Sequence, residues 1–74
     1  MTAIHVIMDI RVKFGNRVRR ARKALDISQE ELAHIADSNR TYISDVERGT
    51  RNPSIAVVER IAKALNVKIG ALLD

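Results

Sequence analysis

The sequence predicts a compact all-helical domain, and three observations support this fold class. Apolar residues recur at three- and four-residue steps along most of the chain, which is the spacing of one face of an α-helix. Residues that typically cap helices stand at the borders of these stretches. The chain has 74 residues, which is enough for only one core. We therefore expect several short helices packed around a single core.

The first helix is expected at residues 10–25, where seven of the thirteen basic residues accompany an apolar face. Asp9 is available as its N-cap. Gly15 lowers the helical propensity of this stretch by about 1 kcal/mol relative to alanine. Residues 1–9 lack clear periodicity and are expected to be a leader of uncertain structure. The apolar face consists of Ile10, Phe14, Val18, Ala21 and Leu25.

The next two helices are expected to be short and joined by a tight turn. Ser28 and Glu31 have the spacing of a capping box, in which each side chain accepts from the backbone amide of the other residue. A polar turn then ends at Asn39, which can cap a third helix at about residues 40–48. Gly49 suits the left-handed conformation that ends such a helix. The expected core residues of the two helices are Leu32, Ala33, Ala36, Ile43 and Val46.

Two further helices complete the predicted domain, which spans residues 10–74. Pro53 and Ser54 open the fourth helix, and its core residues are expected to be Val58, Ile61, Ala62 and Leu65. The fifth helix follows Asn66 at the end of the chain and is strongly apolar. A second copy of the chain would cover this apolar surface. The expected homodimer interface consists of Val67, Ile69, Leu72 and Leu73.

Composition excludes several classes of function. The chain has no cysteine, only two histidines and no glycine-rich phosphate loop, so no catalytic, metal or cofactor site is expected. No apolar stretch approaches the roughly 20 residues needed to span a bilayer. The start of the chain lacks the basic region of a signal peptide. We expect a cytoplasmic protein that is not an enzyme, and its net charge of +4 favours a polyanionic partner.

Two short helices joined by a tight turn make a helix-turn-helix, whose second helix fits the major groove of double-stranded DNA. Side chains on the first turns of the third helix can then reach base edges. Arg40 can donate two hydrogen bonds to guanine. Thr41 can contact a thymine methyl group or a phosphate. Ser44 and Asp45 are further candidate base readers, with simple exposure to water as the alternative for both.

Four motifs carry this pattern, within a match that runs from about Phe14 to Leu73. They are Ser28-Gln29-Glu30-Glu31-Leu32-Ala33, Ser38-Asn39-Arg40-Thr41-Tyr42-Ile43-Ser44, Val46-Glu47-Arg48-Gly49 and Asn52-Pro53-Ser54. In this order they resemble the phage Cro/C1 repressor (Xre) family. The resemblance implies a five-helix bundle of the lambda-repressor-like DNA-binding type. Asp26 departs from the family pattern, because many members carry glycine there.

Within that family, the run from Arg40 to Ser44, followed by Glu47-Arg48-Gly49 and Arg51-Asn52, resembles the controller proteins of restriction-modification systems. This implies a transcription regulator that binds an inverted-repeat operator as a homodimer, with half-sites about 34 Å apart. RNA polymerase is a candidate protein partner. Phage-type and antitoxin-type repressors share much of the pattern, and a helix-turn-helix module that binds protein is a third alternative.

The resemblance also implies roles for individual residues. Gln29 is expected to contact a phosphate, which agrees with the free amides at a helix N-terminus. Arg22 and Glu47 are expected to form a structural pair between the first and third helices. Asn39 and Tyr42 are expected to contact the DNA backbone, with packing of the ring on a neighbouring helix as the alternative for Tyr42. The other expected phosphate contacts are Arg48, Arg51 and Asn52, and weaker candidates on the first helix are Arg17 and Arg20.

Overall fold

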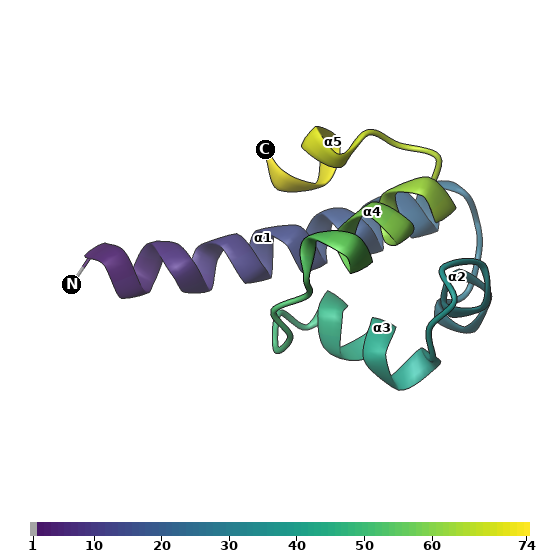
Figure 1. The fold of residues 1–74 in the computed structure, drawn as a ribbon, viewed down its shortest axis with the longest axis horizontal. Coiled ribbons are helices and arrows are strands. Elements are labelled where there is room, and N and C mark those ends of the chain that lie inside the picture. The colour runs from purple at the N-terminus through teal and green to yellow at the C-terminus, as the bar shows by residue number, and fades with distance from the viewer. Residues whose placement is uncertain (1) are drawn as a thin grey trace.

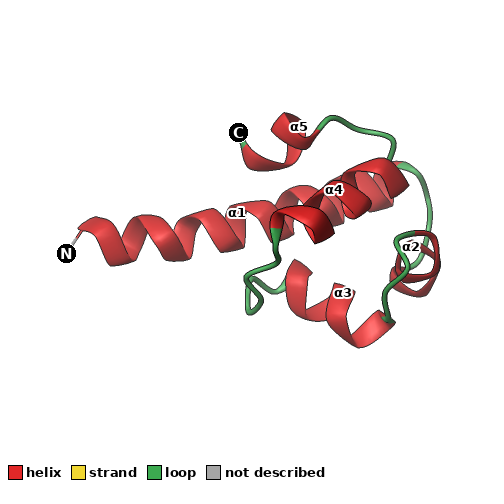
Figure 2. Cartoon of the chain, viewed as in Figure 1, coloured by secondary structure: helices red, strands yellow, loops and turns green. Residues whose placement is uncertain are grey.

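The computed structural model describes residues 2–74, with side chains from residue 10 onward, and this part of the chain contains five helices and no strand. The helices are α1 (Thr2–Ala24), α2 (Gln29–Ile35), α3 (Arg40–Glu47), α4 (Ile55–Ala64) and α5 (Ile69–Leu73). The predicted all-helical fold class is thus confirmed. Figure 1 shows α3 and α5 on opposite sides of α1, which packs against both. Short loops join α2 to α3 and α3 to α4 (Figure 2).

The first helix is longer than the sequence pattern indicates. It begins at Thr2 rather than at residue 10, so it passes through Asp9, and the assignment of Asp9 as its N-cap is wrong. No glycine or proline lies between Thr2 and Ile10 to interrupt the helix. The extra turns project from the body of the molecule as the purple end of the ribbon in Figure 1. The expected leader is therefore a continuation of α1.

One hydrophobic core joins all five helices. Val18 of α1, Leu32 of α2 and Ile43 of α3 are completely buried. Helix α4 adds Ile61 and α5 adds Leu72, and both side chains are 1% exposed. The remaining buried apolar residues are Phe14, Ala33, Ala36, Val46, Val58, Ala62 and Leu65. Every core residue expected for the second, third and fourth helices is therefore buried.

Left-handed residues end the helices. Asp26 after α1, Asp37 after α2 and Asn66 after α4 have φ between 56° and 58°, a conformation in which aspartate and asparagine are more frequent than most residues. Asp26 thus has the conformation that glycine adopts most easily. Gly49 follows α3 with φ 77°, and a Cβ atom there would lie 2.9 Å from Cγ2 of Val12. The loop after α3 is consequently pressed against α1.

The C-terminal helix contributes to the monomer core, which corrects part of the predicted dimer interface. Leu72 is buried, so its side chain is not available to a second copy. Val67 and Ile69 are partly buried against the same core. Leu73 is the member of the set that stays exposed, at 48%. A strongly apolar short helix does not reveal which of its sides meets the core, and here α1 covers one of them.

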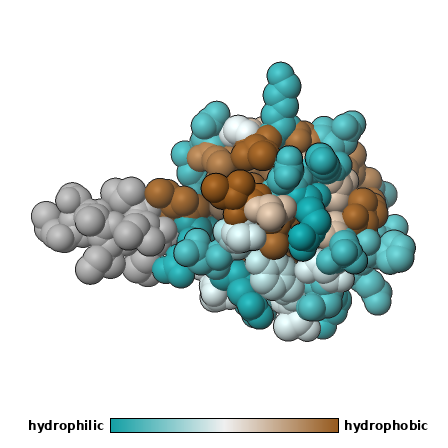
Figure 3. All heavy atoms as spheres, in the orientation of Figure 1, coloured by the Kyte–Doolittle hydropathy of each residue, from teal (hydrophilic) through white to brown (hydrophobic). Residues whose placement is uncertain are grey.

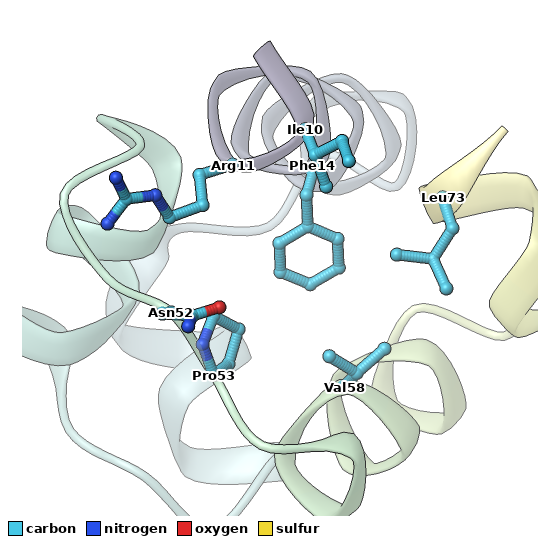
Figure 4. Close-up of a pocket in the computed structure, with 7 residues that line it drawn as sticks. All are labelled: Ile10, Arg11, Phe14, Asn52, Pro53, Val58 and Leu73. Carbon is cyan, nitrogen blue, oxygen red and sulfur yellow. The ribbon is translucent and has the colours of Figure 1, made fainter. Parts of the chain in front are cut away.

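Leu73 borders a small pocket between α1, α4, α5 and the loop before α4. The pocket has a volume of about 70 Å³ and is lined by Ile10, Arg11, Phe14, Asn52, Pro53, Val58 and Leu73. Figure 4 shows Leu73 and Val58 directed toward the ring of Phe14. Apolar side chains also gather on the outer surface of the face that Figure 3 presents.

No helix in the described part of the chain has the length and apolar character of a membrane span.

Candidate nucleic-acid interface

Helix α3 has one face in the core and the opposite face in solvent. Oδ1 of Asn39 accepts a hydrogen bond from the Tyr42 amide at 2.8 Å and thereby caps the helix. Ile43 and Val46 bury the inner face. The preceding turn is closed by the Ser38 amide, which donates to the Ala33 carbonyl at 2.7 Å. The helix is therefore anchored at its start and along one side.

The four candidate base readers have different surroundings. Arg40 and Thr41, on the first turn of α3, are exposed. Ser44 and Asp45, one turn later, are partly buried. The Ser44 hydroxyl accepts a hydrogen bond from Nη1 of Arg48 at 3.1 Å. The outer surface of α3 thus presents Arg40 and Thr41 freely, whereas the other two side chains already have partners or partial cover.

Asp45 is engaged on both carboxylate oxygens. Oδ1 accepts from Nη2 of Arg48, and Oδ2 accepts from Nε of Arg51 at 3.4 Å. Its backbone carbonyl accepts from both the amide and the hydroxyl of Thr50, each at 3.0 Å. Asp45 therefore holds the loop after α3, a role that its expected function as a base reader did not include.

Tyr42 also contacts this loop. The guanidinium carbon of Arg51 lies 4.8 Å from the centre of the Tyr42 ring, which is a cation–π geometry. The ring is partly buried against the core. Tyr42 thus has both the packing that was the alternative expectation and an exposed basic partner. Arg48 and Arg51 keep side-chain exposures of 64% and 48%, so both guanidinium groups face solvent.

Arg22 of α1 and Glu47 of α3 form a buried ion pair. Nε of Arg22 donates to Oε2 of Glu47 at 2.6 Å and Nη2 donates to Oε1 at 3.1 Å. Nη1 of Arg22 also donates to the Ile27 carbonyl at 2.8 Å. The side chains are 10% and 3% exposed. Hydrogen bonding to Glu47 raises the pKa of Arg22, and this outweighs the opposing effect of burial. These are the two residues that the resemblance pairs as structural.

Gln29, the expected phosphate contact at the start of α2, is tied to this pair. Its Nε2 donates to Oε1 of Glu47 at 3.1 Å, which uses one of the two amide hydrogens. A polar pocket of about 230 Å³ lies beside it, lined by Arg19, Gln29, Ser44, Glu47 and Arg48. Arg19 was not among the expected site residues. The available signal was its position three residues before Arg22, which places both on one side of α1.

Helix α1 packs closely on α3, and this contact fixes the orientation of the exposed face of α3. Gly15 is buried, and a Cβ atom there would collide with the Val46 carbonyl oxygen and lie 2.8 Å from that of Glu47. Only a residue without a side chain allows the two backbones to approach so closely. Gly15 is therefore a packing site, although its sequence signal is only a loss of helical propensity.

The remaining predicted phosphate contacts are spread over different elements. Asn52 is exposed on the loop before α4. Arg20 is exposed on α1. Nη1 of Arg17 donates to the Ala71 carbonyl at 3.2 Å, so this side chain connects α1 to α5. The structure therefore gathers one set on α3 and the residues that flank it, and it places Arg17 in a helix contact. The set consists of Asn39, Arg40, Thr41, Arg48, Arg51 and Asn52. Within residues 10–74 no group of acidic, histidine or cysteine side chains could hold a metal ion.

Comparisons with known proteins agree with this geometry. A family model described as helix-turn-helix matches residues 18–72. The control protein C.BamHI of Bacillus amyloliquefaciens is 52% identical over 67 residues, which cover 89% of this chain and 83% of that protein. The control protein C.SmaI of Serratia marcescens is 42% identical over 66 residues, covering 89% of this chain and 79% of the relative.

A solved structure extends the likeness to three dimensions. The crystal structure of the restriction-modification controller protein C.AhdI from Aeromonas hydrophila superposes with a TM-score of 0.80 at 43% identity, covering 82% of this chain and 92% of that one. Proteins of this kind are transcription regulators and not enzymes. The chain belongs to the Xre-type helix-turn-helix family of DNA-binding regulators that includes the restriction-modification controller proteins.

Proposed function

We propose that this protein binds an inverted-repeat operator as a homodimer and thereby controls the transcription of restriction-modification genes. The observation that carries the proposal is the division of α3 into two faces. Its inner face is fixed by Ile43, Val46 and the buried Glu47. Its outer face exposes Arg40 and Thr41. A helix supported in this way can enter the major groove without reorganising the fold.

Arg40 is the proposed principal base reader. Its exposed guanidinium can donate two parallel hydrogen bonds to O6 and N7 of guanine. Thr41 adds a methyl group that suits thymine. Ser44 stays a candidate reader through its hydroxyl, whereas Asp45 is already bound to two arginines. The proposed specific contacts are therefore made by the first turn of α3.

Phosphate contacts would flank this reading turn. Arg48 and Arg51 present exposed cations after α3. Asn39 is exposed at its start, and Asn52 is exposed on the following loop. Gln29 can offer its second amide hydrogen, because Glu47 accepts only one. These groups would position the protein on DNA and supply affinity that does not depend on sequence.

A second copy of the chain is the proposed partner at the C-terminal side. Leu73 is 48% exposed beside Ile10, which is 52% exposed, on the edge of the small apolar pocket. An inverted repeat requires two-fold pairing that places the two reading helices about 34 Å apart. Bound near a promoter, such a dimer would meet RNA polymerase, which makes RNA polymerase the protein partner to test.

Substitution of Arg40 and Arg51 tests the DNA-binding proposal. Wild-type protein first enriches a duplex from a random-sequence pool, and a scrambled duplex serves for comparison. Arg40→Ala should lower affinity for the enriched duplex by about 1–3 kcal/mol per half-site and affect the scrambled duplex much less. Arg51→Ala should weaken both duplexes about equally and flatten the dependence of log affinity on log salt by about 1 unit per contact.

The outcome separates the alternatives for this face. Equal weakening of both duplexes by Arg40→Ala would make Arg40 a phosphate contact rather than a reader. If neither variant alters DNA binding, the interface lies elsewhere on the molecule. Both side chains are exposed, so unchanged thermal melting of the variants is the control for folding.

The dimer is tested by Leu73→Asp. A carboxylate at this exposed position should disfavour an apolar interface and leave the monomer core intact, whereas Ile69→Asp would also disturb packing against that core. Sedimentation velocity should show a shift from dimer toward monomer, and affinity for the enriched duplex should fall with it. Ala71→Asp, at another exposed position of α5, controls for added charge. Unchanged sedimentation of Leu73→Asp would place the interface elsewhere.

A further inference from the structure

The loop after α3 carries two exposed arginines whose positions depend on one carboxylate. Nη2 of Arg48 and Nε of Arg51 donate to different oxygens of Asp45. The side chain of Asp45 is 19% exposed, compared with 64% for Arg48 and 48% for Arg51. The carboxylate therefore lies beneath the two cations and not in front of them.

Further contacts place each arginine in one orientation. Ser44 accepts from Nη1 of Arg48 at 3.1 Å, so this guanidinium is held at two points. The Tyr42 ring lies 4.8 Å from the guanidinium carbon of Arg51. The Asp45 carbonyl binds the amide and hydroxyl of Thr50, between the two arginines in the chain. Side chain and backbone of Asp45 thus organise the same loop.

An acidic residue is otherwise unfavourable on a surface that meets DNA, because it repels phosphates. Ordering a long side chain on binding is also unfavourable. Two arginines that are already oriented before binding avoid much of that ordering. The two effects act in opposite directions, so the sign of the response to neutralising Asp45 shows which one dominates.

We infer that Asp45 is a positioning residue that pre-orients Arg48 and Arg51 for two neighbouring phosphates of the DNA backbone, and that it does not read a base. The inference rests on the proposed DNA-binding function of α3 and its following loop. It replaces the expected reading role of Asp45 with an indirect one. Affinity, rather than sequence preference, is what Asp45 contributes.

The test compares Asp45→Asn with wild-type protein on the enriched and scrambled duplexes. Although the substitution removes a negative charge from the DNA-facing surface, it should weaken binding to both duplexes by at least about tenfold. The salt slope should stay unchanged, because both arginines still reach phosphates. Glu59→Gln removes the same charge from an exposed position on α4 and is the matched control.

A thermodynamic cycle shows whether Asp45 acts through the arginines. In the background of Arg48→Ala with Arg51→Ala, Asp45→Asn should cause no further loss of affinity. NMR relaxation of the arginine Nε–H groups in the DNA-free protein should show greater mobility of Arg51 in Asp45→Asn. This second measurement does not depend on DNA binding, and thermal melting confirms that the variant is folded.

Several results would overturn the inference. Stronger or unchanged binding of Asp45→Asn would make the carboxylate a simple repelling charge. Loss confined to the enriched duplex would restore a base-reading role. A loss that persists in the arginine double variant would mean that Asp45 acts by another route. Failure of wild-type protein to prefer its enriched duplex would instead contradict the proposed function, and unchanged Arg51 mobility in Asp45→Asn would contradict the positioning role alone.

Discussion

Helix α3 carries two carboxylates, Asp45 and Glu47, and each binds arginine in a different environment. Glu47 points inward, where its side chain is 3% exposed and pairs with Arg22. Asp45 lies at the outer side, where it is shared by Arg48 and Arg51. Pairing of a carboxylate with arginine therefore connects α1 to α3 on one side of the helix and holds the loop after α3 on the other. The comparison shows that burial, rather than chemical type, decides what an ion pair does here.

The physical reason is the free-energy cost of a charged group that has lost its partner. In the interior, a charge that loses its partner has no water to replace it. At the surface, water solvates the separated groups, and exposed pairs contribute about 0–1 kcal/mol. We therefore expect stability to depend on the Arg22–Glu47 pair, and DNA affinity to depend on the Asp45 cluster of Asp45, Arg48 and Arg51.

The largest expected effect comes from breaking the buried pair. Arg22→Ala leaves Glu47 buried without its cation and should lower the free energy of unfolding by about 3–5 kcal/mol. Gln29 would be its one remaining side-chain donor among the contacts described above. Urea denaturation at neutral pH measures the change. Asp45→Ala is the matched control on the outer face, and a loss of similar size in both variants would show that burial does not separate the two ion pairs.

A smaller effect is expected from separating the two helices that the buried pair connects. Gly15→Ala forces Cβ against the backbone carbonyls of Val46 and Glu47, which cannot move without shifting α3 or α1. Overpacking of this kind typically costs about 1–3 kcal/mol, even though alanine favours helix. Thermal melting measures the loss.

Gly70→Ala is the control for Gly15→Ala. A Cβ atom at Gly70 meets only the Asp74 carboxylate, at 3.4 Å. The stability of the Gly70→Ala variant should be equal to that of the wild-type protein or slightly higher. If Gly15→Ala melts at the wild-type temperature, the close contact between α1 and α3 is not what holds α3 in place.

The smallest expected effect concerns salt. Asp45→Asn should reduce stability by no more than about 1 kcal/mol at low ionic strength. This difference should shrink in about 1 M NaCl, where the screening length falls to about 3 Å. The destabilisation caused by Glu47→Gln should persist under the same conditions, because buried charges are screened less. Parallel urea titrations of both variants at two salt concentrations provide the comparison.

Features that depend on neighbouring residues could be predicted from the sequence. The Ser28 hydroxyl accepts from the Glu31 amide at 3.0 Å, and the Glu31 carboxylate accepts from the Ser28 amide at 2.8 Å, as a capping box requires. Asn39 caps α3 and Gly49 adopts φ 77° after it. Each of these signals is contained within a few residues. The start of α2 and both ends of α3 followed from them.

Features that depend on distant residues could not be predicted in this way. Packing of α1 on α5 decides which side of α5 is exposed. The burial of Leu72 therefore could not be predicted from the sequence of α5 alone. Arg48 lies one helical turn after Asp45, so their contact is local. Arg51 reaches the same carboxylate from six residues away, and this depends on the conformation of the loop after α3. Helix α1 extends to Thr2, although Asp9 can cap a helix, because no glycine or proline interrupts the segment before Ile10.

The anchoring of α3 along its inner face has a consequence for the evolution and engineering of operator choice. Residues that fix the helix, Ile43, Val46 and Glu47, all point inward. Arg40 and Thr41 are exposed on the outer face. Exchange of these two outer side chains for those of another regulator should therefore transfer target preference without loss of folding. The core would stay constant while new target sequences are selected by changing the outer side chains one at a time.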